Sequence, residues 1–179
     1  MSNDARKWNR TMTQTNELVD INATIAYMAD ELRPRLAQHP IMIGIHTGGA
    51  WVAERLHTLL GLNEALGTLD ISFYRDDFSR LGMNPQVKTS NLPVNVENRH
   101  VILVDDVLHT GRTIRAALNE IFDYGRPASV TLAVLIHRDG RELPIEAQVV
   151  GHHLKLKKHQ HIKLLGPEPL KLEIQEAHT

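Results

Sequence analysis

Two adjacent carboxylates and the turn that follows them are the residues of this chain best suited to chemistry. Asp105 and Asp106 follow the apolar run 101–104, and residues 109–113 read His-Thr-Gly-Arg-Thr before an apolar-periodic stretch. This order predicts a buried strand, an acidic pair at its carboxyl end and a turn into a helix. Backbone N–H groups at the helix start and the threonine hydroxyls would bind a 5-phosphate, and Gly111 would allow close approach.

The acidic pair must serve another part of such a ligand, because carboxylates repel a phosphate. A sugar diol is the natural partner, since each carboxylate can accept hydrogen bonds from a ribose hydroxyl, directly or through Mg²⁺ and its waters. The alternative is a solvated acidic pair beside an ordinary helix cap.

A second anion site is predicted nearer the N-terminus. The apolar residues 41–45 read as a buried strand, and Thr47, Gly48 and Gly49 follow before a helix with apolar residues to position 60. Paired glycines permit a backbone that points successive N–H groups inward. A simple tight turn is the alternative for this loop.

The elements that position these loops follow from hydrophobic periodicity. Apolar residues at three- and four-residue steps predict an amphipathic helix from Asn16 to about Pro34, capped by Thr15 or Asn16. Residues 1–15 are expected to be a loose arm. The polar face of the helix carries the acids Glu17, Asp20, Asp30 and Glu31.

The middle of the chain predicts a strand at 69–73 and then a flexible loop over residues 74–99. A connection of that length is usually functional, so it is expected to act as a lid with Arg75 and Asp76 facing the pocket. The helix that follows the acidic pair carries Phe122 on its apolar face. A further apolar strand, 130–136, ends at His137 and Arg138, where nucleotide-binding sheets place ligands.

Residues 139–179 are expected to form a small hood over the site. Alternation over residues 170–174 predicts a strand there. The basic run 155–161 is interpreted as an exposed edge strand protected by lysines, with a basic binding patch as the alternative.

Three separated stretches carry a resemblance to a known family. Residues 101–113 resemble the phosphoribosyl pyrophosphate (PRPP) signature of type I phosphoribosyltransferases. Residues 69–78 and 125–145 resemble the PyrR family, which comprises pyrimidine-operon attenuation regulators with uracil phosphoribosyltransferase activity. The match runs from about Asn16 to Ile174. It implies one α/β domain over residues 1–179, with the type I phosphoribosyltransferase fold: a parallel twisted sheet flanked by helices, with the C-terminal hood.

The resemblance implies that uracil attacks PRPP, Mg²⁺ accompanies PRPP, and UMP and pyrophosphate are the products. It implies that Asp105 and Asp106 are catalytic and hold the metal indirectly. The residues implied for the 5-phosphate and ribose are Asp105, Asp106, His109, Thr110, Gly111, Arg112 and Thr113. Those implied for pyrophosphate are Thr47, Gly48, Gly49, Arg75, Asp76 and Arg138. Those implied for the base are His109, His137, Arg138 and His152.

The chain departs from the family pattern at several of these positions. The family usually has arginine where Gly48 stands, aspartate where His137 stands and tyrosine where His109 stands. Gly48 and His137 both concern the leaving group or its metal, whereas His109 and His152 concern the base. We therefore expect low activity or altered base choice, and a gain of UMP formation from Gly48→Arg. The alternative is a catalytically weak PRPP- and UMP-sensing regulator that acts through a protein partner.

The resemblance also implies an mRNA leader as a partner and a homodimer or higher homo-oligomer. The 179-residue chain has a net charge of −1, and its first helix is acidic, so tight RNA binding is not expected to carry over. Lys155, Lys157 and Lys158 could supply a different patch. Cysteine is absent and no apolar run is long enough to span a membrane, which indicates a soluble cytoplasmic protein.

Overall fold

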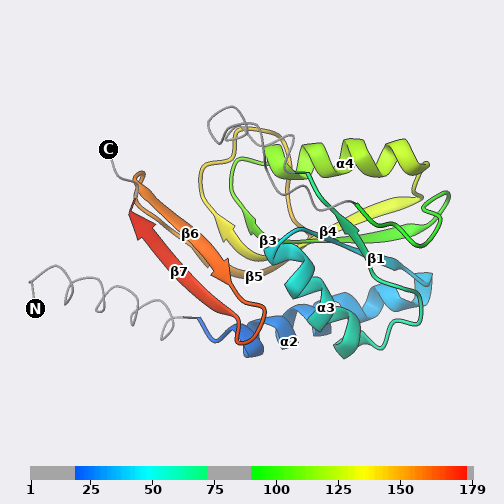
Figure 1. Ribbon diagram of the computed structural model, residues 1–179, viewed down its shortest axis with the longest axis horizontal. Helices are drawn as coiled ribbons and strands as arrows, with labels where there is room; N and C mark the ends of the chain where they lie inside the picture. Colours follow the sequence, from blue (N-terminus) through cyan, green and yellow to red (C-terminus); the bar gives the residue numbers. More distant parts are fainter. Residues whose placement is uncertain (1–18, 72–89, 177–179) are drawn as a thin grey trace, which may run out of the picture.

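A five-stranded parallel sheet forms the centre of the computed structural model, which describes residues 19–71 and 90–176 (Figure 1). The strand order is β2-β1-β3-β4-β5. The strands are β1 (Ile41–Ile45), β2 (Gly67–Leu69), β3 (His100–Leu108), β4 (Ser129–Arg138) and β5 (Val149–Leu154). A separate antiparallel pair, β6 (Gln160–Leu165) and β7 (Lys171–Glu176), stands beside this sheet. The alternation over 170–174 therefore lies in a strand, as predicted.

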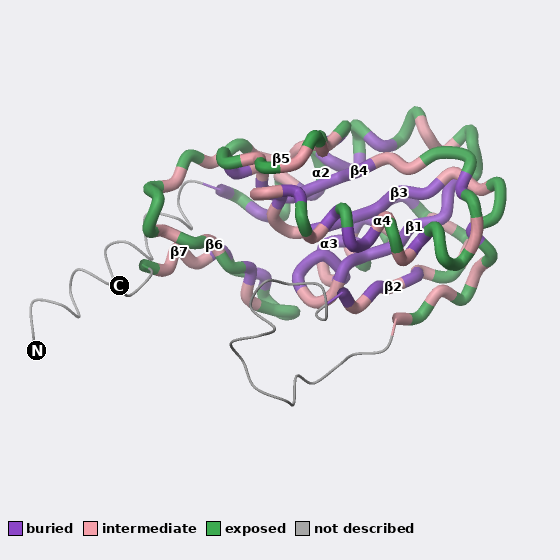
Figure 2. The backbone as a smooth tube through the Cα atoms, turned by 90° about the horizontal axis from the view of Figure 1, so that it is seen from above, coloured by how far each residue is buried: buried purple, intermediate pink, exposed green. Residues whose placement is uncertain are grey.

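Helices cover both faces of the sheet. Helix α2 (Ile21–Leu32), its 3₁₀ extension η1 (Arg33–Gln38) and α3 (Gly48–Leu60) lie on one face, and α4 (Arg112–Tyr124) lies on the other. Each face has its own apolar cluster, so the strands are buried on both sides (Figure 2). Phe122 lies outside these clusters and is 56% exposed, which corrects its predicted place on the apolar face of α4. Within the described residues, no helix has the length and apolarity needed to span a membrane.

Helix α2 is capped by Asp20, whose Oδ1 accepts a hydrogen bond from the backbone N–H of Ala23 at 3.0 Å. The predicted caps, Thr15 and Asn16, lie outside the described residues, and the helix begins only at Ile21. Asp20 was read as part of an acidic face because periodicity indicates a helix face more reliably than it indicates a helix end.

We expect Asp20→Ala to lower the free energy of unfolding by about 1 kcal/mol, because the Ala23 N–H loses its partner. In a chain of this size that corresponds to a fall of about 2–4 °C in Tm, measured by thermal denaturation. The matched control is Asp20→Asn, which keeps an oxygen acceptor and should retain most of the stability. An equal loss in both variants would contradict the capping role.

Strand β3 runs through the acidic pair and ends only at Leu108. The prediction that the strand stops at Asp105 was wrong, because the hydrogen-bond ladder with β4 continues past the apolar run: Asp105 pairs with Val134 and Leu108 pairs with His137. A ladder joins backbone groups and does not depend on apolar side chains. The acidic side chains therefore project from a rigid strand.

The strand predicted at 69–73 lies earlier within the described residues, at Gly67–Leu69, and residues 72–73 lie outside them. Most of the expected lid, residues 74–89 with Arg75 and Asp76, lies outside the described residues. Its last part packs on the body: Asn91 and Thr68 exchange backbone hydrogen bonds of 2.7 and 2.8 Å, and Val96 is 1% exposed. Asn91 therefore bridges to the edge strand β2, and Val96 packs in the core.

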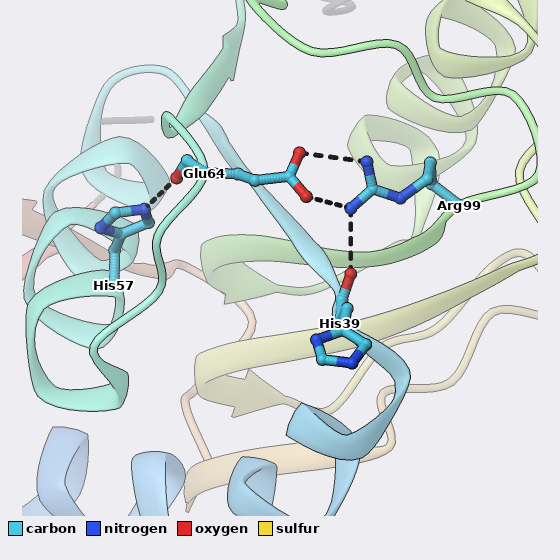
Figure 3. Close-up of polar contacts among 4 residues, drawn as sticks. All are labelled: His39, His57, Glu64 and Arg99. Carbon is cyan, nitrogen blue, oxygen red and sulfur yellow. Dashed lines mark hydrogen bonds and ion pairs between the residues drawn. The ribbon is translucent and has the colours of Figure 1, made fainter.

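Arg99 joins three connections at the amino ends of the strands (Figure 3). Its guanidinium donates to both carboxylate oxygens of Glu64 and, at 3.0 Å, to the carbonyl oxygen of His39. His57 contacts the Glu64 carbonyl oxygen at 2.7 Å. Hydrogen bonding from Arg99 lowers the pKa of Glu64, so the pair's contribution to stability is present at neutral pH and is lost as pH falls below 4.5 through that lowered pKa.

The hood is smaller than the predicted range 139–179. Strand β5 pairs in parallel with β4 and completes the main sheet, so only the β6–β7 pair stands apart. The basic run forms the connection between β5 and β6, with Lys155, Lys157 and Lys158 exposed outside any strand, and β6 begins at Gln160. The edge-strand interpretation of this run was wrong, because its alternation of apolar and basic residues has no pairing partner there.

Candidate active site

A cavity of about 840 Å³ opens at the carboxyl edge of the parallel sheet, next to β6 and β7. The ends of β1, β3 and β4 converge there, as they do in open α/β sheets that bind ligands at this edge. The predicted site residues that line the cavity are Thr47, Gly48, Asp105, Asp106, His109, Thr110, Arg112, Thr113 and Arg138.

The other predicted residues do not line it. Arg75 and Asp76 lie outside the described residues, and Gly49, Gly111, His137 and His152 are absent from the cavity wall. Gly49 instead allows close packing, since a Cβ there would lie 2.7 Å from the Val104 carbonyl oxygen. Gly111 has φ +93° at the N-cap of α4, a conformation that L side chains rarely adopt.

His137 and His152 were predicted at the base because they follow β4 and lie on β5. In the structure, His137 Nε2 lies 2.6 Å from the Arg141 guanidinium, and its ring lies 4.7 Å from that of His153. His152 pairs with Ile136 inside the sheet. Sequence places both residues near the sheet edge, but side-chain direction decides which residues reach the cavity.

Sequence reasoning missed one wall of the cavity. Trp51 enters from the second turn of α3, and His161, Lys163 and Gln175 enter from β6 and β7, together with Ile162, Leu164, Leu165 and Gly166. The register places His161 opposite Gln175. No motif marks these residues, and only the alternation of β6 and β7 carries a weak signal. Their approach to the cavity depends on where the β6–β7 pair docks.

The two acids differ in environment. Asp105 is 3% exposed, and its Oδ1 accepts the backbone N–H of Asp106 at 2.9 Å. Asp106 is half-buried, and its Oδ1 accepts the N–H of Val107 at 2.9 Å. Each carboxylate is thus oriented by a neighbouring peptide N–H.

Two helices begin at the cavity without a side-chain cap. Neither Thr47 at the start of α3 nor Gly111 at the start of α4 provides a capping hydrogen bond. At α4 the Thr110 hydroxyl, which precedes the N-cap, accepts the Arg112 N–H at 3.2 Å. Uncapped helix starts favour anions, and here two of them border one cavity.

Gly48 and Asp106 touch across the cavity floor. A Cβ placed on Gly48 would lie 2.7 Å from Asp106 Cγ and closer still to its Oδ2. A side chain at position 48 therefore requires the Asp106 carboxylate to move. The glycine keeps the start of α3 and the acid of β3 together.

Arg138 places a buried cation in the cavity wall. The residue is 7% exposed, and within the described residues its guanidinium has no ion-pair or hydrogen-bond partner. Burial lowers the pKa of Arg138 below the ordinary value of an arginine side chain. Burial also lowers the pKa of His109, helped by the Arg138 charge, so this imidazole is neutral near pH 7. The wall thus offers one fixed cation and one neutral imidazole.

Comparisons with known proteins agree with this geometry. Residues 11–163 match the model of the phosphoribosyl transferase domain. The chain is 60% identical to the bifunctional protein PyrR of Nitrosococcus oceani, over 88% of this chain and 92% of that protein. It is 56% identical to the bifunctional protein PyrR of Pseudomonas fluorescens, over 86% and 94%.

Solved structures show the same fold at lower identity. A hypoxanthine-guanine-xanthine phosphoribosyltransferase superposes with a TM-score of 0.58 at 23% identity, covering 75% of this chain and 74% of that one. A purine phosphoribosyltransferase from Pyrococcus horikoshii gives the same TM-score and identity, covering 75% and 82%.

Proposed function

The chain belongs to the PyrR family of phosphoribosyltransferases, and from this premise we propose that its cavity binds PRPP and transfers the ribose 5-phosphate to uracil. One observation supports this most: two helix starts whose N-cap residues provide no side-chain hydrogen bond border a cavity that an acidic pair also lines. PRPP has a phosphate at one end, a pyrophosphate at the other and a diol between them. The cavity offers one matching group to each part.

The start of α4, with Thr110 and Thr113, is proposed to hold the 5-phosphate. Asp105 and Asp106 accept hydrogen bonds from the ribose hydroxyls. The start of α3 at Thr47 and Gly48, with the Arg138 guanidinium, holds the departing pyrophosphate. Positive charge develops on the ribose as that bond breaks, so catalysis depends on positioning and on fixed dipoles at the leaving group.

The base is proposed to lie against the wall formed by Trp51 and the β6–β7 pair. Trp51 supplies an apolar ring face, while His109, His161 and Gln175 supply hydrogen-bonding groups. The same architecture occurs in purine phosphoribosyltransferases, so purines are the natural competitors to compare with uracil.

Mg²⁺ is proposed to bind together with PRPP. No group of three or more potential ligands from histidine, aspartate and glutamate occurs among the described residues, so the protein by itself offers no full coordination set. Asp105 and Asp106 fit the usual arrangement, in which one or two carboxylates and substrate oxygens share the ion and its waters. When bound, Mg²⁺ neutralises pyrophosphate charge.

The proposal is tested by measuring UMP formation from PRPP with uracil, other pyrimidines and purines. We expect uracil to be the preferred acceptor. No turnover with any base would refute the enzyme proposal. If PRPP or UMP still bound in that case, the chain would be a nucleotide-sensing regulator acting through a protein partner.

We expect Arg138→Met to lower kcat/KM for PRPP by at least about tenfold, because one charge-assisted contact to the leaving group is worth about 1.5–3 kcal/mol. Methionine keeps much of the buried volume, so folding should survive. The control is Arg126→Met, which removes an exposed arginine. Equal kcat/KM in the Arg138 variant and wild type would exclude the role at pyrophosphate.

A second function is proposed because the curated relatives are named bifunctional. The exposed Lys155, Lys157 and Lys158 give a basic connection suited to RNA phosphates, whereas the exposed Asp30 and Glu31 of α2 do not. A filter-binding titration with a pyrimidine-operon leader RNA, with and without UMP, tests this. Loss of binding in a triple lysine-to-glutamine variant would locate the surface, and no binding by wild type would reject the function.

We also propose that the protein works in the cytoplasm as a homodimer or higher homo-oligomer. The family resemblance and the absence of cysteine support these two assignments. Sedimentation velocity at several protein concentrations measures the assembly state, and a monomer throughout would exclude the oligomer.

A further inference from the structure

Arg141 occupies a position that the catalytic proposal does not use. It does not line the cavity, yet its guanidinium reaches three acceptors. Nη1 donates to the carbonyl oxygen of His109, Nε donates to that of Ile145 at 2.7 Å, and Nη2 donates to Nε2 of His137 at 2.6 Å. One side chain thus joins the turn at 109–111, the loop at 139–145 and the end of β4.

The 139–145 loop holds that turn through its backbone as well. The N–H groups of Glu142 and Leu143 both donate to the Thr110 carbonyl oxygen, at 3.0 and 3.1 Å. A Cβ on Gly111 would meet Ile145, Arg141 and Leu143 within 3.5 Å, so the turn and the loop are in close contact. The turn that carries Thr110 is therefore held by residues of the 139–145 loop, which do not line the cavity.

A nearby ion pair cannot replace Arg141. Glu142 Oε2 lies 2.9 Å from Arg112 Nε, but the two side chains are 53% and 51% exposed. Exposed pairs of this kind are worth about 1 kcal/mol or less. Arg141 is half-buried and donates to two backbone carbonyls, so its contribution is the larger.

The contact with His137 requires a neutral imidazole, because Nε2 must accept the Arg141 hydrogen bond. The other ring nitrogen, Nδ1, is buried without a hydrogen-bond partner among the described residues. The charged or titratable groups that act on this ring are Arg141, His153 from β5 and Asp139, and the residue paired with His137 on β3 is Leu108. Burial first, and then the Arg141 and His153 charges, lower the pKa of His137.

We propose that Arg141 is a positioning residue for the 5-phosphate of PRPP: it fixes the 109–111 turn, and it does so fully only while His137 is neutral. The inference rests on the proposed function, since it takes the start of α4 as the phosphate site. A turn held in place binds substrate and transition state alike, so its loss should raise KM and leave kcat nearly unchanged.

The first test compares Arg141→Met with Arg126→Met. Arg126 is an exposed arginine that does not line the cavity. We expect the KM for PRPP to rise about tenfold in the Arg141 variant with kcat within about twofold of wild type, and no change in the control. A purely structural role would lower Tm and the active fraction, so kcat would fall at constant KM. That outcome would overturn the proposal.

Binding measured by calorimetry keeps this test separate from the proposed function. If wild type forms no UMP but binds PRPP, and Arg141→Met weakens that binding about tenfold, the positioning role stands while the transferase proposal fails. If wild type is active and Arg141→Met binds PRPP as wild type does, the positioning role is refuted and the transferase proposal stands.

The second test follows the PRPP dissociation constant from about pH 8 to about pH 5.5 in wild type and His137→Gln. Glutamine keeps an oxygen acceptor for Arg141 and does not titrate. PRPP and His109 titrate equally in both proteins, so the ratio of the two constants reports His137. We expect the wild-type constant to rise relative to the variant only below pH 6.5, the ordinary pKa of histidine. A ratio that is the same at every pH would remove His137 from the proposal.

Discussion

Asp105→Asn combined with Asp106→Asn is expected to lower kcat/KM for PRPP by about a hundred- to ten-thousand-fold. Each carboxylate is expected to accept charge-assisted hydrogen bonds worth about 1.5–3 kcal/mol, and about 1.36 kcal/mol corresponds to one factor of ten. Both acids project from β3 and line the cavity, which the starts of α3 and α4 also border. Steady-state kinetics with PRPP as the varied substrate measures the effect.

The two acids should be separated, because Asp105 also has a structural role. It is 3% exposed and accepts the Asp106 N–H, so Asp105→Asn could alter the local backbone. Asp106→Asn is the cleaner change, and its Oδ1 still accepts the Val107 N–H. We expect Asp106→Asn alone to cost about ten- to a hundredfold with an unchanged Tm. Wild-type kinetics in this variant would show that Asp106 does not contact the ribose.

Gly48→Arg is expected to lower kcat/KM for PRPP by about a hundredfold. This reverses the expectation from the family pattern, in which an arginine at this position would add a cation for pyrophosphate. Here any Cβ at position 48 falls on the Asp106 carboxylate. The change would therefore displace an acid from the ribose and shift the start of α3, and two lost contacts of about 1.5 kcal/mol each account for the factor.

A double-mutant cycle isolates this steric coupling. Gly48→Ala adds only the Cβ and should by itself lower kcat/KM by about tenfold or more. In an Asp106→Ala background the obstructing carboxylate is gone, so Gly48→Ala should cost little further. If the losses in kcat/KM from Gly48→Ala and Asp106→Ala multiply, the effect of position 48 does not depend on Asp106. Increased activity of Gly48→Arg would refute the prediction directly.

The parts of the site that sequence predicted share a simple property. The acidic pair, Thr110 and the residues Thr47 and Gly48 each follow an apolar run, and the carboxyl ends of parallel strands meet at one edge of the sheet. A short contiguous segment is enough to identify such a loop, because a loop that directly follows a buried parallel strand begins at the carboxyl edge of the sheet. The family resemblance then assigned the ligand, and the relatives at 56–60% identity agree with that family.

The parts that sequence did not predict depend on contacts between distant segments. Trp51 belongs to α3 and Gln175 to the last strand, and Gln175 reaches the cavity because the β6–β7 pair lies beside it. His137 follows a strand end in the expected way, but Arg141 binds its ring and holds it out of the cavity wall. Strand ends are visible in a sequence, whereas side-chain direction is decided by packing partners.

By itself the sequence determined the parallel α/β class, the loops that follow β1, β3 and β4 at the sheet edge, and the family. These depend on local apolar periodicity and on contiguous motifs. Only the tertiary structure decided the length of β3, the membership of β5 in the main sheet and the close approach of Gly48 to the Asp106 carboxylate. Backbone ladders and close approaches join residues far apart in the chain, and no periodicity along the chain records which partner each residue meets.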